Sequence, residues 1–496
     1  MDLTLPDSGW TTCLFTLAVT TTLGVSIPVG INIGVINAPS VYIKSWINDT
    51  IYERYGVVLS SSGLDMLFSI VVSIFLIGGV IGSLSGAIIA DKFGRKKSYL
   101  ICGILHTMGG LCFVFCRQLI SVELLLLGRT LVGLAAGLTT SVLPMYLAEV
   151  SPTKLRGTIS TLCGLGLTVG VVAGQIVSLD QVLGTNRNWH YAVGSFTILN
   201  IFCYVPYAWL PESPKYLFSI RDDPKGTLIA IRRLFGKSSI SDDYVKLQRE
   251  NTATASISSD SEQNFKMMDN DPATRSMWSV IADPTLRLPL VLVCALQGGQ
   301  QLSGINAVFY YSVSIFESVG LSSTSAKFAN LGVGCLNLLV GSLSPYLMGH
   351  YNQRTLCLIS CSFCALYMFC VAMLIHLMDV ISWFNYASIF AILLYIIFFQ
   401  LGLGPIPFFI GSELFELSSR PSAMALGSLS SWGCNFVVGM LFPLLSSAWG
   451  AFAFLPCSIT CVLLTVLILF YLPETRGRDV SDVVVLVSKG FKSKVV

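Results

Sequence analysis

A run of uncharged polar residues at 300–311, QQLSGINAVFYY, interrupts an apolar segment and is the stretch of this chain that says most about its chemistry. The segment extends from about 286 to 316, long enough to cross a bilayer at roughly 20 residues per span. Amide side chains inside a membrane need a partner or water, and their paired donors and acceptors suit a neutral ligand covered with hydroxyl groups. This run therefore indicates hydrogen bonding to a polyhydroxyl molecule.

The spacing of these amides predicts how a helix would present them. Gln297, Gln300 and Gln301 fall at i, i+3 and i+4, so on a helix they share one face. Gly304 then weakens the helix just before Asn306. Transporters place their substrates at broken helices of this kind.

The composition requires that membrane helices position this run. Of the 496 residues, 53% are hydrophobic and 11% charged, and the mean hydropathy is +0.73, whereas a soluble protein carries about 25% charged residues. The fold class we predict is an all-α membrane protein with twelve transmembrane helices. The spans are expected at about 13–36, 65–90, 98–118, 123–146, 158–180 and 191–210, and at 286–318, 325–349, 355–378, 384–412, 422–448 and 450–472.

Basic residues predict the orientation, because Lys and Arg are retained on the cytoplasmic side. They gather between the second and third spans, between the fourth and fifth, and in the central polar interval. Both termini are therefore expected in the cytoplasm of a multi-pass plasma-membrane protein. The sequon at Asn48 then falls in the first external loop, where glycosylation is expected.

Several function classes find little support in the sequence. The net charge of +3 is too small to indicate nucleic-acid binding. Cys361 and Cys364 form a CxxC within a span without a second pair, so we expect no metal site or other cofactor. No Ser/His/Asp set or phosphate-binding loop occurs at a consistent depth, so we expect no enzyme.

Repeated elements indicate two related halves. Glu149 and Arg156 follow the fourth span as Glu413 and Arg420 follow the tenth, 264 positions later, and the Pro-Glu pairs after spans six and twelve are 262 positions apart. Such nearly equal offsets indicate duplication. We therefore predict a cytoplasmic N-terminus, two six-helix bundles joined by a cytoplasmic linker, and a cytoplasmic tail, at 1–12, 13–210, 211–285, 286–472 and 473–496. Within the linker, TLIAIRRLFG predicts an amphipathic helix.

Charges at the cytoplasmic helix ends suggest gates that pair across the two halves in one state and separate in the other. The positive-inside rule alone is an alternative explanation for these charges. The copy after the eighth span keeps only Arg354 of the basic turn that follows the second span. The candidate gate residues are Asp91, Arg95, Glu149, Arg156, Glu413 and Arg420.

Six motifs resemble those of the facilitative hexose transporters of animals, a sugar porter branch of the major facilitator superfamily. They are GVINAP at 34–39, PMYLAEVSPTKLRG at 144–157, PESPKYL at 211–217, QQLSGINAVFYYS at 300–312, GPIPFFIGSELF at 404–415 and PETRGR at 473–478. The resemblance covers nearly the whole chain in order. It implies uniport of a monosaccharide by alternating access in the lipid bilayer, and no obligate protein partner is evident.

The resemblance also implies which residues contact the sugar. A pyranose stacks its C–H face on an aromatic ring while its hydroxyls find donors and acceptors. Packing through interhelical amide bonds, worth about 1 kcal/mol each, is the alternative role for these side chains. The candidate sugar contacts are Gln297, Gln300, Gln301, Asn306, Asn337, Trp432 and Asn435.

This chain departs from the family pattern at several of the positions near the sugar. Cys163-Gly164 replaces a glutamine contact, Gln400 and Phe408 stand where a glutamate and a tryptophan are usual, Gly298-Gly299 replaces Leu-Ser, and Pro28 replaces a frequent glutamine. The site is thus poorer in hydrogen bonds than that of glucose carriers. Glucose, fructose and other hexoses remain open, and SSRPSA at 418–423 resembles the fructose-carrying members slightly more.

Coupling to protons is not expected. Proton-coupled sugar porters have an aspartate in the first span that answers an arginine in the fourth, and here those positions resemble Asn32 and Arg129. A proton relay needs a group that titrates, so uniport is preferred. The alternatives are a proton-coupled symporter and a transporter-like sugar sensor, the latter because lost gate contacts bias a two-state equilibrium without abolishing binding.

Overall fold

The computed structural model describes residues 10–152, 156–235, 277–378, 381, 383–415, 419–475, 483, 486 and 487, and every regular element among them is a helix. Ten helical segments of that part are long and apolar enough to cross a membrane. One of them, Ser422–Tyr471, holds two spans separated by a tight turn, and the shorter apolar helix Leu162–Val177 supplies another. The twelve predicted spans are therefore all represented.

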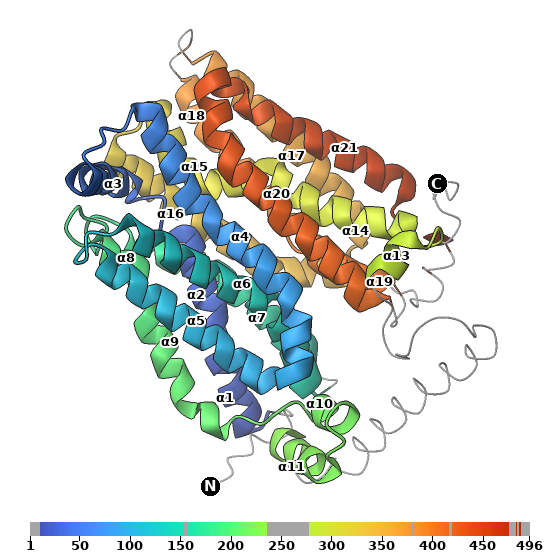
Figure 1. Ribbon diagram of the computed structural model, residues 1–496. Helices are drawn as coiled ribbons and strands as arrows, with labels where there is room; N and C mark the ends of the chain where they lie inside the picture. The colour runs from blue at the N-terminus through green and yellow to red at the C-terminus, as the bar shows by residue number, and fades with distance from the viewer. Residues whose placement is uncertain are drawn as a thin grey trace.

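The first half packs around two long neighbouring helices, α4 and α6, with α5 against α6 and α2 against α7. α4, α5 and α6 alternate in direction, because only Gly94 separates α4 from α5 and residues 117–121 separate α5 from α6 (Figure 1). Its helices are α1 Thr12–Thr21, α2 Ile27–Gly34, α3 Ser40–Tyr55, α4 Ser61–Phe93, α5 Arg95–Cys116, α6 Val122–Val150, α7 Arg156–Val177, α8 Trp189–Gly194, α9 Phe196–Tyr204, α10 Pro214–Ser219 and α11 Pro224–Phe235.

The second half repeats this plan, with α17 against α18 and α21, and α14 against α20. The two halves meet along α4 and α20, and again along α7 and α16. Its helices are α13 Met277–Ala282, α14 Arg287–Gln300, α15 Asn306–Ser318, α16 Ser323–His350, α17 Gln353–His376, α18 Phe384–Leu401, α19 Ile406–Leu414, α20 Arg420–Trp449 and α21 Leu455–Tyr471.

Both halves begin with a span interrupted by one π-helical turn, at Thr22–Ser26 and at Gln301–Ile305. Gly304 has φ 98° and ψ 3°, so the seventh span breaks at the predicted glycine. The tenth span, predicted as continuous over 384–412, is instead broken at 402–405 between α18 and α19. Pro405 and Pro407 explain the second break, because proline lacks an N–H and disfavours helix in the residue before it.

The predicted first external loop contains the helix α3, which the sequence analysis did not anticipate. Asn48 lies in α3 and is half-buried, and Thr50 of its sequon is 3% exposed. Glycosylation of Asn48 stays a prediction. Helix α3 marks one end of the bundle, the α3 end, and α10 and α11 mark the opposite end, the α11 end (Figure 1).

The repeated Pro-Glu motifs have the same role in both halves. Glu212 accepts backbone N–H bonds from Arg95 and Lys96 at 3.0 Å, and so caps the start of α5. Glu474 accepts from the backbone N–H groups of Gln353 and Arg354 at 3.0 and 3.2 Å, at the start of α17. A carboxylate there satisfies orphan donors and complements the helix dipole. The shared contact supports the predicted duplication.

The amphipathic helix expected in the polar interval is α11. It buries Thr227, Ala230, Ile231 and Leu234 and carries Arg232 and Arg233 in its last turn. The Thr11 hydroxyl donates to the Leu234 carbonyl at 2.8 Å, which ties α11 to the start of α1. The remainder of the predicted linker, residues 236–276, and most of the predicted tail lie outside the described residues.

Candidate functional site

The amides of the seventh span are linked to one another across the break at Gly304. Asn306 Nδ2 donates to Gln301 Oε1, and Gln301 Nε2 donates to Gln300 Oε1 at 3.1 Å. All three side chains are at least nine-tenths buried. Since the π-helical turn brings position 306 back toward 301, the broken helix gathers amides that a regular helix would separate.

This amide chain is anchored on two neighbouring spans. Gln300 Nε2 donates to the carbonyls of Leu403 and Gly404 at 3.0 and 2.5 Å, the backbone left open where the tenth span breaks. Gln301 Nε2 also donates to Ser431 Oγ of α20 at 2.9 Å. The Gln300 side chain beside the break of span seven therefore supplies the donors for carbonyl groups at the break of span ten, as buried polar groups require.

The three glutamines do not all face the same neighbour. Gln297 Nε2 donates to the Pro407 carbonyl at 3.2 Å, on the same side as Gln300, whereas Gln301 also reaches α20. Each of these three amides thus donates to another group of the protein.

Two other predicted contacts have unused acceptors. Asn337 in α16 and Asn435 in α20 are 5% and 9% exposed, and the Oδ1 atom of each is buried with no hydrogen-bond partner among the described residues. A buried amide oxygen without a donor costs about 1–3 kcal/mol. A ligand that brings hydroxyl hydrogens to this depth would remove that cost.

Trp432 of α20 lies at the interface of the two halves. Its ring packs edge-on against Phe75 of α4, with centroids 6.1 Å apart, and rests on the backbone at Gly79. The Arg129 guanidinium lies 4.7 Å from the centroid of the same Phe75 ring. The tryptophan thus presents an aromatic surface where α20 of the second half contacts α4 of the first half.

Replacing Gly79 with alanine tests this arrangement, because a Cβ there would collide with the Trp432 ring. Overpacking of this kind costs about 1–3 kcal/mol, so α4 and α20 must separate or the ring must turn. We expect sugar uptake per surface molecule to fall at least about fivefold, measured as initial tracer uptake normalised to surface protein. Gly433→Ala, where no atom lies within 4 Å, is the control, and an equal fall there would contradict the role of Trp432.

The structure also shows the surroundings of four residues at which this chain departs from the family pattern. Cys163 Sγ accepts a bond from Ser26 Oγ at 3.6 Å, and Phe408 is 60% exposed. Gln400 is half-buried, and a Cβ at Gly341 would lie 2.8 Å from its Nε2. Pro28 is buried in α2, where its carbonyl accepts from Asn32 Nδ2 at 2.9 Å. Of these four side chains only Gln400 carries an amide, and none carries a carboxylate.

The candidate gate residues of the first half contact one another. Arg95 forms a two-pronged pair with Glu149 at 3.0 and 3.1 Å, and Asp91 lies 3.2 Å away. Ser213 Oγ also donates to Glu149 at 2.5 Å. Burial raises the pKa of the nearby Glu212 carboxyl above its usual range, against the opposing effect of its backbone N–H donors.

The candidate gate residues of the second half likewise bond within their own half. Glu413 Oε1 accepts from Gln353 Nε2 at 3.3 Å, and Arg420 donates to the Phe415 carbonyl at 3.3 and 3.4 Å. Arg156 begins α7, and its side chain lies outside the described part. Pairing of gate charges across the two halves, expected in one state of the cycle, stays a prediction.

Contacts between the halves were missed by the sequence analysis. Asn37 Nδ2 donates to the Phe309 carbonyl at 2.9 Å and to Ser312 Oγ at 2.7 Å. Asn330 Oδ1 accepts from Ser312 at 2.6 Å and from Gln175 Nε2 at 3.0 Å. Asn37 belongs to the GVINAP motif, but nothing in its sequence context identifies the partner half. A further bond between the halves joins Ser83 of α4 to Ser428 of α20 at 2.5 Å. It lies nearer the α11 end, since Ser83 is ten residues from the end of α4 and 22 from its start.

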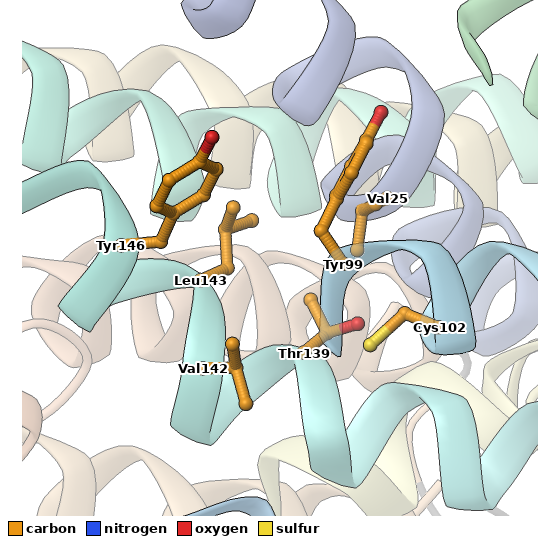
Figure 2. A pocket seen from close by; sticks show the side chains of 7 residues that line it. All are labelled: Val25, Tyr99, Cys102, Thr139, Val142, Leu143 and Tyr146. Carbon is orange, nitrogen blue, oxygen red and sulfur yellow. The ribbon is translucent and has the colours of Figure 1, made fainter. Parts of the chain in front are cut away.

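A small cavity elsewhere in the first half carries no comparable chemistry. Figure 2 shows its lining, which includes Val25, Cys102 and Thr139, around a volume of about 10 Å³. The hydroxyls of Tyr99, Tyr146 and Thr139 each donate to a backbone carbonyl. The cavity is no larger than one water and leaves these groups satisfied, so it is a packing gap rather than a ligand site.

Comparison with known proteins places the chain among membrane carriers. The family described as "Sugar (and other) transporter" matches residues 17–486. The chain is 38% identical to "Solute carrier family 2, facilitated glucose transporter member 3" of Ovis aries over 92% of its length and 88% of that protein. It is 35% identical to member 1 of Gallus gallus over 92% and 90% of the two chains.

Solved structures show the same fold. The chain resembles the inward open conformation of the xylose transporter XylE from E. coli, with a TM-score of 0.74 at 20% identity over 95% of this chain and 99% of that one. A second similar structure is the proton:xylose symporter XylE bound to 6-bromo-6-deoxy-D-glucose, with a TM-score of 0.72 at 20% identity over 96% and 99%. Both belong to the major facilitator superfamily fold, which the sequence analysis predicted.

Proposed function

Because this chain belongs to the sugar (and other) transporter family, we propose that it carries a hexose across the plasma membrane as a uniporter, with both termini in the cytoplasm. The observation that supports a hexose best is the pair of buried amide oxygens on Asn337 and Asn435, which lack donors among the described residues. Asn337 lies on α16, which packs against α15, and Asn435 lies on α20, which packs against both α15 and the π-helical turn at Gln301–Ile305. A neutral polyhydroxyl ligand supplies the missing hydrogens without bringing charge into the membrane.

The proposed carrier cycle uses two halves, residues 13–210 and 286–472, that rock about the site. The polar bonds at the α3 end cross from one half to the other, whereas the described gate contacts at the α11 end stay within each half. If α11 faces the cytoplasm, as the basic residues predict, this arrangement is an inward-facing state. The sugar site would then exchange with the cytoplasm.

Uniport is supported by the surroundings of Arg129. Its guanidinium donates to the backbone carbonyls of Asn32, Val71 and Val72 at 3.0, 3.1 and 3.3 Å. The Asn32 side chain cannot titrate, and the described hydrogen bonds of Arg129 all go to backbone carbonyls and not to a carboxylate. A proton relay through Arg129 would need a titratable partner beside it.

We expect sugar uptake to be insensitive to an imposed proton gradient. The measurement is tracer influx of glucose, fructose and galactose into proteoliposomes with and without an acidic exterior, and the sugar with the highest rate identifies the preferred hexose. At equilibrium the internal sugar should equal the external sugar. Accumulation above the external concentration would instead support the proton-coupled alternative, and specific binding without flux would support a sensor.

A further inference from the structure

An ion pair joins the two halves at the α3 end, outside the candidate sugar site. Lys327, in the second turn of α16, places its Nζ 2.8 Å from both oxygens of Asp180, which lies in the turn after α7. The Lys327 side chain is 6% exposed and that of Asp180 is 32% exposed. This is a cation of the second half held by a carboxylate of the first half.

Helix α3 completes the surroundings of the pair. The Lys327 ammonium lies 5.1 Å from the centroid of the Tyr42 ring, and the Tyr42 hydroxyl lies 3.5 Å from Asp180 Oδ1. A cation over an aromatic face gains a further attraction when it is desolvated. Tyr42 therefore contacts both members of the pair and covers it from the α3 side.

A buried polar cluster continues from the pair toward the membrane interior. Asn330 follows Lys327 by three residues on α16, so the two side chains lie on neighbouring positions of one helix face. Gln175, which donates to Asn330, precedes Asp180 by five residues. The same two segments therefore meet twice, through the ion pair at the rim and through the Gln175–Asn330 bond below it.

Separating the halves at this end would have a specific energetic consequence. A nearly buried lysine that loses the one carboxylate paired with it among the described residues must be rehydrated or remain an uncompensated charge. Opening the α3 end breaks the pair and lets water reach Lys327, whereas opening the α11 end leaves it intact. The pair thus favours one state of the carrier over the other.

We propose that Asp180 and Lys327 are positioning residues for transport, an ionic latch that holds the α3 end closed and limits the return of the empty carrier. This inference rests on the proposed uniport. With the latch intact, reopening the α3 end is the slow step of net influx. Neither residue contacts the candidate sugar contacts, so the latch acts on the equilibrium between states and not on sugar recognition.

The test compares Lys327→Met, Asp180→Asn and the exchanged pair Asp180→Lys/Lys327→Asp in oocytes. Loss of the latch speeds the return of the empty carrier, so the ratio of maximal zero-trans influx to maximal zero-trans efflux should rise about threefold to tenfold in both single variants. The exchanged pair should return the ratio toward that of the wild type. Lys44→Met is the matched control, since Lys44 pairs with Asp65 at 2.6 Å within one half at the same end.

A second measurement needs no sugar. In nanodiscs, backbone hydrogen exchange of residues 309–316 and 327–333 should be faster in Lys327→Met than in the wild type and unchanged in Lys44→Met. An unchanged exchange rate together with an unchanged flux ratio would overturn the latch. If the wild type transports none of the tested sugars and hydrogen exchange is still faster in Lys327→Met, the latch stands and the proposed uniport is overturned.

Discussion

Replacing Gln300 with leucine is expected to raise the KM for the transported hexose by about tenfold or more, with near-normal surface expression. The substitution removes the donor to the Leu403 and Gly404 carbonyls and the acceptor for Gln301. In the proposed sugar complex the same amide would bond sugar hydroxyls instead; each such bond is worth about 1 kcal/mol, and 1.4 kcal/mol corresponds to a factor of ten in affinity. The measurement is concentration-dependent tracer uptake normalised to surface protein.

Gln300→Leu is also expected to lower the maximal transport rate. Because Gln300 bonds the break of the tenth span, its loss should also disturb α19 and lower the maximal rate, whereas a residue that only touched sugar would change KM alone. Ser431→Ala, which removes a single bond to Gln301, should produce a smaller change in KM, about threefold. Gln118→Leu, at an exposed position, serves as the control for an amide removed far from the site. Unchanged kinetics in Gln300→Leu would contradict the site as placed.

The break at Gly304 and the duplication could be predicted from the sequence because both depend on local patterns. A glycine among amides in an apolar span weakens the helix wherever the chain lies, and equal offsets between motifs survive without knowledge of the fold. The structure bears out both, with φ 98° at Gly304 and with Glu212 and Glu474 capping corresponding helices.

The partners of the predicted residues could not be deduced in this way. Sequence periodicity places Gln300 at a depth in the membrane, but its bonds to Leu403 and Gly404 depend on a second break that the continuous apolar run at 384–412 concealed. The helix α3 was missed because its residues show no strong amphipathic pattern. Lys327 could not be singled out from the sequence, because its burial against Asp180 is visible only in the structure.

The gate charges show a similar limit. The sequence analysis placed Arg95 and Glu149 at cytoplasmic helix ends without pairing them with each other, and the structure joins them at 3.0 Å. Spacing could not say whether each charge bonds within its half or across the interface, because that depends on the state of the carrier. In this state Arg95 and Glu413 both bond within their own halves.

Replacing Gly304 with alanine is expected to lower the maximal transport rate at least about tenfold. An L-residue at this positive φ costs about 1–2 kcal/mol, and a Cβ would lie 3.1 Å from both Cys457 Sγ and the Met368 methyl carbon. The chain should relieve this strain by a more regular helix, which would turn Asn306 away from Gln301 and separate the amide chain. The measurement is the maximal rate of tracer uptake per surface molecule, together with the melting temperature of the purified protein.

Two glycine variants separate strain from function. Gly320 has φ +94° in the turn after α15, so Gly320→Ala carries a comparable backbone penalty away from the amide chain, and Gly332→Ala adds a methyl where no atom lies within 4 Å. Gly320→Ala should lower the melting temperature about as much as Gly304→Ala while keeping most of the transport rate, and Gly332→Ala should change neither. If Gly304→Ala and Gly320→Ala lowered the transport rate equally, backbone strain alone would account for the effect, and the broken seventh span would not be the element that organises the sugar site.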